Sequence, residues 1–372
     1  MKRLNYIDGL KGWCAVSVCI LHFQLMFAIN GYVGWKCLPE AALNPAEYYF
    51  KWFPLSILSN NSFPLYIFFA LISFIVCYSF LKNKNEDKLK QKIIMRYFRF
   101  LPLVLIACLV AYLLLAFDLC PLQEYYDITG NTWGYARLEE HYSFFEALKI
   151  GFVTAFFQGT QLVSPFWCLH YIFLGSMMSF VIMLLYTRLN NKVFFFAFLI
   201  LLFYFADQNY LSFLVGMIAA IIAGKEYALS KSRGAVLVLA GCIFGLFPLV
   251  WLPGFINIAT LYAIGAGFVI VGIHCCFSNH RLLCNRFMEF LGRESLGLIV
   301  WQMLVLQSLN IFLYNYFYKI GMGDYFNIAI NFMINAIVSL FLTWGSSKTI
   351  TPLTDHICNR TKSLLWKSNE TT

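Results

Sequence analysis

The feature that most constrains this chain is a series of apolar segments, each long enough to cross a lipid bilayer as a helix. About 20 apolar residues in helical conformation span the hydrocarbon core. Polar residues, proline and glycine divide the sequence into ten predicted spans, at about residues 11–30, 62–81, 101–117, 166–187, 193–206, 210–224, 234–251, 255–274, 295–315 and 326–345. Runs of this length predict an all-α, polytopic membrane bundle of about ten transmembrane helices.

The composition agrees with a membrane protein and excludes a soluble helical one. Hydrophobic residues make up 60% of the 372 residues and charged residues 12%, whereas soluble domains carry about 25% charged residues. The first apolar segment lacks a small-residue cleavage site and is followed by further spans, so we expect a retained helix rather than a signal peptide. The fifth and sixth spans are the shortest, and only residues 207–209 separate them.

The distribution of lysine and arginine predicts the orientation. Cytoplasmic loops carry an excess of basic residues, and placing the N-terminus inside puts most of the 27 basic residues on the cytoplasmic side. The net charge of +9 therefore reflects membrane topology rather than nucleic-acid binding. We expect both termini in the cytoplasm, a membrane domain over residues 1–345 and a cytoplasmic tail over residues 346–372.

Two long segments, at about residues 31–61 and 118–165, fall on the outer side in this topology. The second combines acidic and aromatic residues, which suits either contact with carbohydrate or an ordinary interfacial loop. Cys37 and Cys120 lie in these two segments, and a disulfide between them stays open. No metal site is predicted, because the histidines, cysteines and acids do not cluster at ligand spacing.

His22 lies near the middle of the first span. A titratable side chain at that depth is costly and by default marks a functional site. A neutral imidazole can take a proton from a hydroxyl group as a general base. The structural alternative, a buried histidine bonded to a neighbouring helix, fits the sequence equally well.

Three basic residues could meet an anionic ligand on the cytoplasmic side. Lys11 lies about 16 Å before His22 along a helix, where by itself it is an interfacial anchor. Arg96 and Arg99 share one helix face and could hold phosphate groups bidentately, or could simply flank the third span. No glycine loop of the nucleotide-hydrolase type occurs. Asp8 and Gly9 are expected to precede the first helix, with Asp8 as its N-cap.

Four short motifs in this order resemble the acyltransferase-3 family of integral-membrane O-acyltransferases, which decorate bacterial glycans and related molecules. The ten-span layout is also similar to that family's. The motifs are Tyr6-Ile7-Asp8-Gly9-Leu10-Lys11-Gly12 followed by His22; Phe68-Phe69-Ala70-Leu71-Ile72-Ser73-Phe74; Arg96, Arg99 and Pro102; and Phe290-Leu291-Gly292-Arg293-Glu294-Ser295.

The resemblance implies an acyl-CoA co-substrate, with acetyl-CoA the expected one, that enters from the cytoplasm of a bacterium into a multi-pass protein of the inner membrane. It implies no permanently bound cofactor. Arg96 and Arg99 would hold the donor's phosphates, and Lys11 would add charge at the mouth of the pocket. The acceptor would be a hydroxyl of a glycan or another cell-surface molecule, and no nucleic acid takes part. The oligomeric state is not indicated.

In the same scheme His22 is the general base, and Trp167 and His170 line the acceptor side. Several positions depart from the family pattern: Lys11 stands where arginine is usual, and Ile72-Ser73 stands where the second motif has Ser-Gly. Ile172 stands where the family has an acid, and Gln302 stands where many members have histidine. These departures keep open two alternatives, a transporter or flippase for polysaccharide or lipid-linked glycan and a catalytically silent scaffold.

Overall fold

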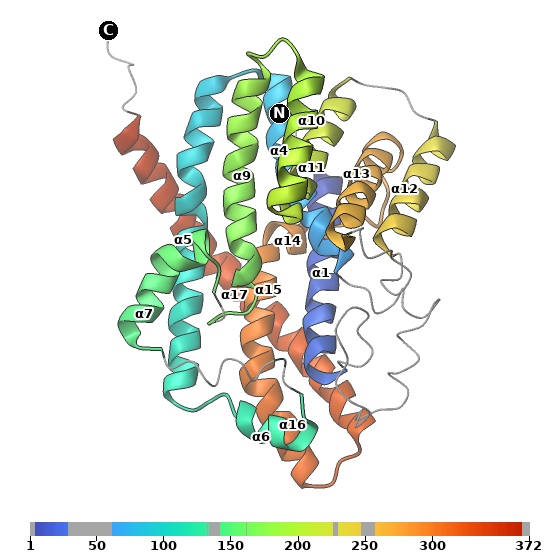
Figure 1. Cartoon of the computed structure of the whole chain (residues 1–372). Coiled ribbons are helices and arrows are strands. Elements are labelled where there is room, and N and C mark those ends of the chain that lie inside the picture. Colours follow the sequence, from blue (N-terminus) through green and yellow to red (C-terminus); the bar gives the residue numbers. More distant parts are fainter. Residues whose placement is uncertain are drawn as a thin grey trace. The chain divides into compact units, whose positions relative to one another are not determined.

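The computed structural model describes residues 4–28, 62–131, 133, 142–160, 162–225, 230–246 and 257–366. The part of the chain within these ranges is helical and contains no strand (Figure 1). The all-α prediction is therefore confirmed. Cys37 lies outside the described residues, so its pairing with Cys120 stays open.

Each of the ten predicted spans contains a helix. The helices are α1 (Asn5–Phe27), α4 (Phe63–Asn83), α5 (Glu86–Ala116), α6 (Leu122–Thr129), α7 (Phe144–Lys149), α8 (Ala155–Phe157), α9 (Phe166–Tyr186), α10 (Lys192–Ala206), α11 (Leu211–Gly224), α12 (Lys231–Gly245), α13 (Ile258–Cys276), α14 (Arg286–Arg293), α15 (Ser295–Val305), α16 (Ile311–Lys319) and α17 (Asp324–Leu365). Shorter elements are the π-helices η3 (Ile150–Thr154) and η6 (Leu306–Asn310) and the 3-10 turn η4 (Gln208–Tyr210).

Seven of these helical stretches are long and apolar enough to cross a membrane, which confirms a polytopic helical bundle. They are α1, α4, α5, α9, α13, the continuous stretch from α15 to α16, and α17. The predicted fifth and sixth spans are the shorter apolar helices α10 and α11. With 15 residues, α10 is about 22 Å long, less than the roughly 30 Å of a hydrocarbon core.

The chain divides into two compact units. The first contains Met1–Leu21, Phe50–Lys90 and Tyr171–Ser295, and the second contains His22–Tyr49, Gln91–His170 and Leu296–Thr372. The described helices α4, α10, α11, α12, α13 and α14 lie wholly in the first unit. The described helices α6, α7, α16 and α17 lie wholly in the second.

Glycines allow the helices of the first unit to approach closely. A Cβ added at Gly241 of α12 would lie 2.6 Å from the carbonyl oxygen of Gly265 in α13. One added at Gly216 of α11 would lie 2.1 Å from the carbonyl oxygen of Ala70 in α4. Small residues at such crossings favour helix association in lipid, where close packing replaces the hydrophobic effect.

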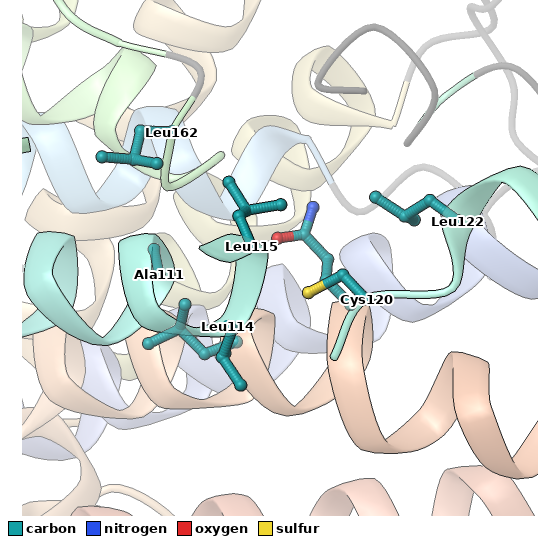
Figure 2. Close-up of a pocket in the computed structure, with 8 residues that line it drawn as sticks. Ala111, Leu114, Leu115, Cys120, Leu122 and Leu162 are labelled. Atoms are coloured by element: carbon teal, nitrogen blue, oxygen red, sulfur yellow. The ribbon is translucent and has the colours of Figure 1, made fainter. Parts of the chain in front are cut away.

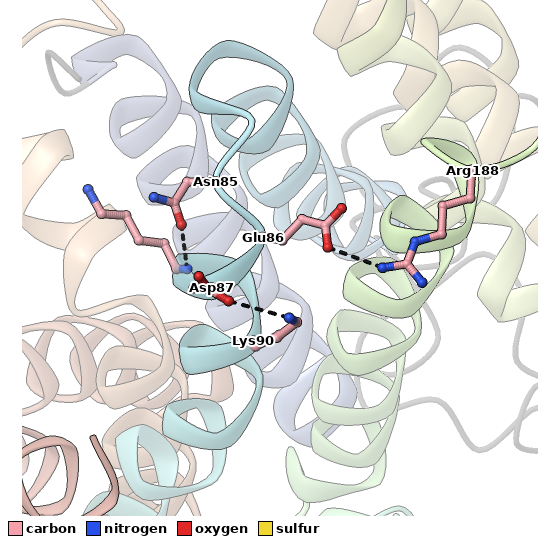
Figure 3. A network of polar contacts seen from close by, with 6 residues as sticks. Asn85, Glu86, Asp87, Lys90 and Arg188 are labelled. Atoms are coloured by element: carbon pink, nitrogen blue, oxygen red, sulfur yellow. Dashed lines mark hydrogen bonds and ion pairs between the residues drawn. The ribbon is translucent and has the colours of Figure 1, made fainter. Parts of the chain in front are cut away.

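The start of α5 is fixed by polar contacts within the first unit. The side-chain oxygen of Asn85 accepts a hydrogen bond from the backbone N–H of Lys88 at 2.8 Å, as an N-cap does. Figure 3 shows Glu86 reaching Arg188, which follows α9, with 3.3 Å between Oε2 and the guanidinium nitrogen. The Arg188 side chain is exposed and that of Glu86 is partly exposed, so this ion pair adds about 1 kcal/mol or less to stability.

Part of the segment predicted on the outer side forms capped helices in the second unit. Ser143 and Glu146 form a reciprocal capping box at the start of α7, in which the Ser143 hydroxyl accepts from the Glu146 N–H. The backbone N–H of Ser143 donates to the Glu146 carboxylate at 2.7 Å. These hydrogen bonds hold the pKa of Glu146 below its ordinary value, because they favour the charged carboxylate.

A stripe of polar side chains runs along one buried face of α17 in the second unit. Its members recur every three or four residues, which is one face of a helix. They are Asn327, Asn331, Asn335, Ser339, Thr343 and Ser346. Buried amides within a membrane helix need hydrogen-bond partners. Asn327 donates to the Tyr314 carbonyl oxygen, Asn331 donates to Asn327, and Asn335 donates to Asn310 and to the backbone carbonyl of Gln302.

Candidate functional site

His22 is buried near the C-terminal end of α1, with 6% of its surface exposed. Its Nδ1 lies 3.3 Å from the side-chain oxygen of Gln302 in α15. Its ring stacks on Trp133, with 6.2 Å between ring centroids and 27° between planes. In the neutral tautomer whose Nδ1–H donates to this oxygen, Nε2 is the acceptor nitrogen. The hydrogen bond to another helix that the structural alternative requires is thus present.

The segment that carries Trp133 is fastened to the end of α1. The Asn131 side chain donates to the carbonyl oxygens of Leu25 and Met26, at 3.0 and 2.6 Å. The Tyr125 hydroxyl also donates to the Met26 carbonyl. The last carbonyls of a helix have no partner within it, so these contacts satisfy the end of α1 and bring Trp133 onto the His22 ring.

A chain of buried amides continues from Gln302 into η6 and α17. The Asn335 side chain donates to the Gln302 carbonyl oxygen at 3.3 Å and to Asn310 Oδ1 at 2.8 Å. Asn310 in turn donates to Asn331 Oδ1 at 2.9 Å, and Asn331 donates to Asn327 Oδ1 at 2.8 Å. The sequence analysis missed these residues, although asparagines spaced four apart in an apolar helix were a usable signal.

Arg96 and Arg99 lie on α5 in the second unit and share a helix face, as predicted from their spacing. Arg96 is half-buried, and its guanidinium carbon lies 4.6 Å from the centroid of the Phe100 ring. Arg99 is exposed. Both side chains carry the planar, multi-donor guanidinium group that binds phosphate oxygens in other proteins.

Trp167 and His170 lie in the first turns of α9, within the second unit. Trp167 is 40% exposed. The loop at Gly159 packs closely on both residues. Gly159 has a φ of +75°, and a Cβ there would lie 3.1 Å from His170 Nδ1 and 3.3 Å from the Trp167 Cα. An exposed indole beside a half-buried imidazole offers a stacking face and a hydrogen-bonding group, which suits a sugar ligand.

Lys11 lies in the first unit, where its Nζ is 5.9 Å from the ring centroid of Phe68 in α4. This contact joins the first and second motifs of the sequence. The prediction that Asp8 precedes the helix as its N-cap is wrong. Helix α1 begins at Asn5, so Asp8 lies in its first turn. The backbone N–H of Ile7 donates a hydrogen bond to the Leu4 carbonyl oxygen at the start of this turn. A carboxylate there still interacts favourably with the helix dipole.

The first and last motifs pack against each other in the first unit. A Cβ added at Gly292 of α14 would lie 1.7 Å from the Asp8 carbonyl oxygen and 3.0 Å from the Gly12 nitrogen. One added at Gly9 would lie 1.7 Å from the Leu283 carbonyl oxygen. The glycines of both motifs therefore serve backbone contact between α1 and the α14 region, which gives Gly9 a structural role.

Figure 2 shows a cavity in the second unit between α5, α6 and η6. Its volume is about 20 Å³, room for about one water molecule. The lining is Ala111, Leu114, Leu115, Cys120, Leu122, Leu162, Leu304 and Gln307. The Gln307 side-chain nitrogen is buried and has no hydrogen-bond partner among the described residues. This cavity is too small for a coenzyme or a sugar.

Ile172 and Gln302, which stand where the family has an acid and often a histidine, have different structural settings. Ile172 is buried in the first unit and presents an apolar side chain. Gln302, in the second unit, contacts the His22 ring directly. The second departure is thus part of the surroundings of the candidate base.

The chain was compared with protein families, curated proteins and solved structures. The family model described as an acyltransferase domain, of the acyltransferase-3 type, matches residues 4–347. No curated protein and no solved structure matches the chain. The matched range contains all four motifs and every candidate site residue named above. This chain belongs to the acyltransferase-3 family and is a membrane acyltransferase.

Proposed function

We propose that the protein transfers an acyl group, acetyl in the first instance, from acyl-CoA to a hydroxyl of a glycan or related cell-surface molecule. The observation that carries this proposal is the setting of His22. It is a buried imidazole whose Nδ1 is engaged by Gln302, so its Nε2 can accept a proton. A titratable side chain buried in a membrane helix is costly and by default marks a functional site.

The proposed reaction is a direct transfer. His22 Nε2 takes the proton of the acceptor hydroxyl while the hydroxyl oxygen attacks the thioester carbonyl. The new C–O bond forms, the C–S bond breaks, and the departing sulfur of CoA receives the proton from the imidazolium. A positioned general base contributes about 10²–10⁴-fold to such a step. No acyl-enzyme intermediate is needed.

The donor's phosphates are assigned to basic side chains. Arg96 and Arg99 supply in-plane N–H groups from one face of α5, and Lys11 adds a further positive charge. Because Lys11 and His22 lie on the same helix, eleven residues separate them by about 16 Å. The extended pantetheine arm of an acyl-CoA is suited to cover that length.

The acceptor side is assigned to Trp167 and His170, since an exposed indole suits stacking on a sugar ring. In this scheme the protein lies in the bacterial inner membrane, with the donor on the cytoplasmic side. This assignment places the Arg96 and Arg99 pair at the cytoplasmic end of α5, as the distribution of basic residues predicts.

Consumption of the donor distinguishes this function from transport or scaffolding. Membranes containing the protein should release free CoA thiol from acetyl-CoA when a glycan extract is added, and a donor panel with succinyl-CoA defines the acyl group. A transporter would move glycan without any covalent change, and a scaffold would do neither. The proposal would be rejected if, with every acyl-CoA donor, membranes containing the protein released no more CoA thiol than membranes lacking it.

The double variant Arg96→Ala/Arg99→Ala should raise KM for acetyl-CoA by about 100-fold or more, with little change in kcat, because each arginine loses at least one hydrogen bond to a phosphate. Each hydrogen bond to a charged group is worth about 1.5–3 kcal/mol, and about 1.4 kcal/mol corresponds to tenfold. The measurement is initial rate against acetyl-CoA concentration. Arg188→Ala is the matched control, because Arg188 is also basic and predicted to be cytoplasmic but pairs with Glu86.

The fragment S-acetyl-pantetheine, which lacks the phosphates, sharpens this test. The wild type and the double variant should use it equally poorly, since the lost contacts are to groups that it does not have. A defect of the same size with both donors would mean that the arginines support the fold rather than the phosphates.

A further inference from the structure

We propose that Gln302 is the positioning residue of His22. Its side-chain oxygen holds the Nδ1–H of the ring and so presents Nε2, with its lone pair, to the acceptor hydroxyl. This inference rests on the proposed role of His22 as the base. It concerns a residue that the family pattern marks only as a departure.

The contact joins two side chains that are withdrawn from solvent. Gln302 is 1% exposed and His22 is 6% exposed, and the atoms that meet are 3.3 Å apart. A histidine in water exchanges freely between its two neutral tautomers, whereas a buried ring takes the tautomer that its partner selects. An oxygen at Nδ1 selects the tautomer in which Nδ1 is the donor and Nε2 the acceptor nitrogen.

Gln302 is itself held by the amide chain of the second unit. The backbone carbonyl oxygen of Gln302 accepts a hydrogen bond from the Asn335 side chain. Asn335 also donates to Asn310 in η6. Asn310 in turn contacts Asn331. These bonds tie α15 and η6 to α17 at the level of Gln302. A base must be oriented by a third group if it is to act in one geometry, and this chain holds the backbone from which the Gln302 side chain extends.

The plane of the His22 ring is restricted by a second, independent contact. Trp133 stacks on His22, and Asn131 fastens that segment to the carbonyls of Leu25 and Met26. Stacking restricts the plane of the ring but does not choose between its two nitrogens. Only a hydrogen-bonding partner makes that choice, so among these contacts the tautomer is assigned to Gln302.

The test compares kinetic constants of Gln302 variants of the full-length protein in membranes. Gln302→Leu should lower kcat about 10- to 100-fold, a part of the 10²–10⁴ that a positioned base supplies, with KM for acetyl-CoA within about twofold of the wild type. Gln302→Glu keeps an oxygen at the same position and should recover most of the lost kcat. Gln302→Asn withdraws the oxygen by one methylene and should behave like Gln302→Leu.

Gln307→Leu is the matched control. Gln307 is a buried glutamine of the neighbouring η6, and its side-chain nitrogen faces no described partner. The same substitution there should leave kcat unchanged. The thermal midpoint and the amount of each variant in the membrane are measured alongside, because a purely structural role would lower these together with activity.

Two results would overturn the inference. One is a wild-type kcat in both Gln302→Leu and Gln302→Asn while His22→Ala is inactive. That result would mean that His22 acts as the base without being positioned by Gln302. The other is a loss in all three Gln302 variants that follows the loss of folded protein. Full activity in His22→Ala is a different failure, because it rejects the proposed function itself and the role of Gln302 with it.

Discussion

Replacing His22 by alanine should reduce kcat/KM for acyl transfer by at least about 100-fold. The variant loses the group that accepts the hydroxyl proton, and general-base catalysis contributes about 10²–10⁴-fold. The ring is buried against Trp133 and Gln302, so water would replace it poorly as a base. The measurement is the rate of CoA thiol release in membranes that contain equal amounts of wild-type and variant protein.

Two further variants separate chemistry from folding. His22→Gln keeps a polar side chain of similar length in the buried position but cannot act as a base, so it should be as inactive as His22→Ala while remaining folded. His356→Ala makes the same change at an exposed histidine of α17 and should retain wild-type activity. Normal turnover in His22→Gln would show that the histidine is a structural bonding group.

Replacing Gly292 by valine should prevent stable folding of the first unit. Even a single added carbon at this position would lie 1.7 Å from the Asp8 carbonyl oxygen, well inside van der Waals contact. Helices α1 and α14 would have to separate, and overpacking of this kind costs about 1–3 kcal/mol or more. We expect a lower thermal midpoint and a lower yield of protein in the membrane, measured by a fluorescence-detected melting assay.

Two other glycines, Gly9 and Gly345, provide matched tests of this prediction. Gly9→Val should behave like Gly292→Val, because its added carbon would lie 1.7 Å from the Leu283 carbonyl oxygen. Gly345→Ala, in α17, should leave the thermal midpoint unchanged or raise it. A Cβ there meets no atom within 4 Å, and alanine favours a helix by about 1 kcal/mol over glycine. Equal midpoints for Gly292→Ala, Gly292→Val and the wild type would contradict the close crossing.

The fold could be predicted from the sequence because hydropathy alone identifies spans. Every predicted span contains a helix, and the two shortest, α10 and α11, were singled out as short. The ends of the helices were harder to predict from the sequence. Helix α1 starts at Asn5 rather than after Asp8, since a backbone bond from Ile7 to Leu4 opens the first turn. Such a bond leaves no signature in residue type.

The candidate site was only partly predictable. His22 and the arginine pair are visible because charge and titratable groups are rare in apolar segments. The partner of His22 is not, since Gln302 lies 280 residues away along the chain and only the packing of α1 with α15 in the second unit brings the two together. Trp133 comes from a segment interpreted as either a carbohydrate-binding or an ordinary interfacial loop, and it stacks on His22 instead.

The central claim is that this protein moves an acyl group from CoA to a hydroxyl acceptor with His22 as the base. The most direct test is transfer of label from radiolabelled acetyl-CoA in membranes that contain the wild type or His22→Ala. We predict that label enters the glycan fraction with the wild type and that none enters with His22→Ala. Equal labelling by both proteins would remove His22 from the chemistry. No labelling by the wild type with acetyl-CoA, succinyl-CoA or other acyl donors would contradict the transferase account.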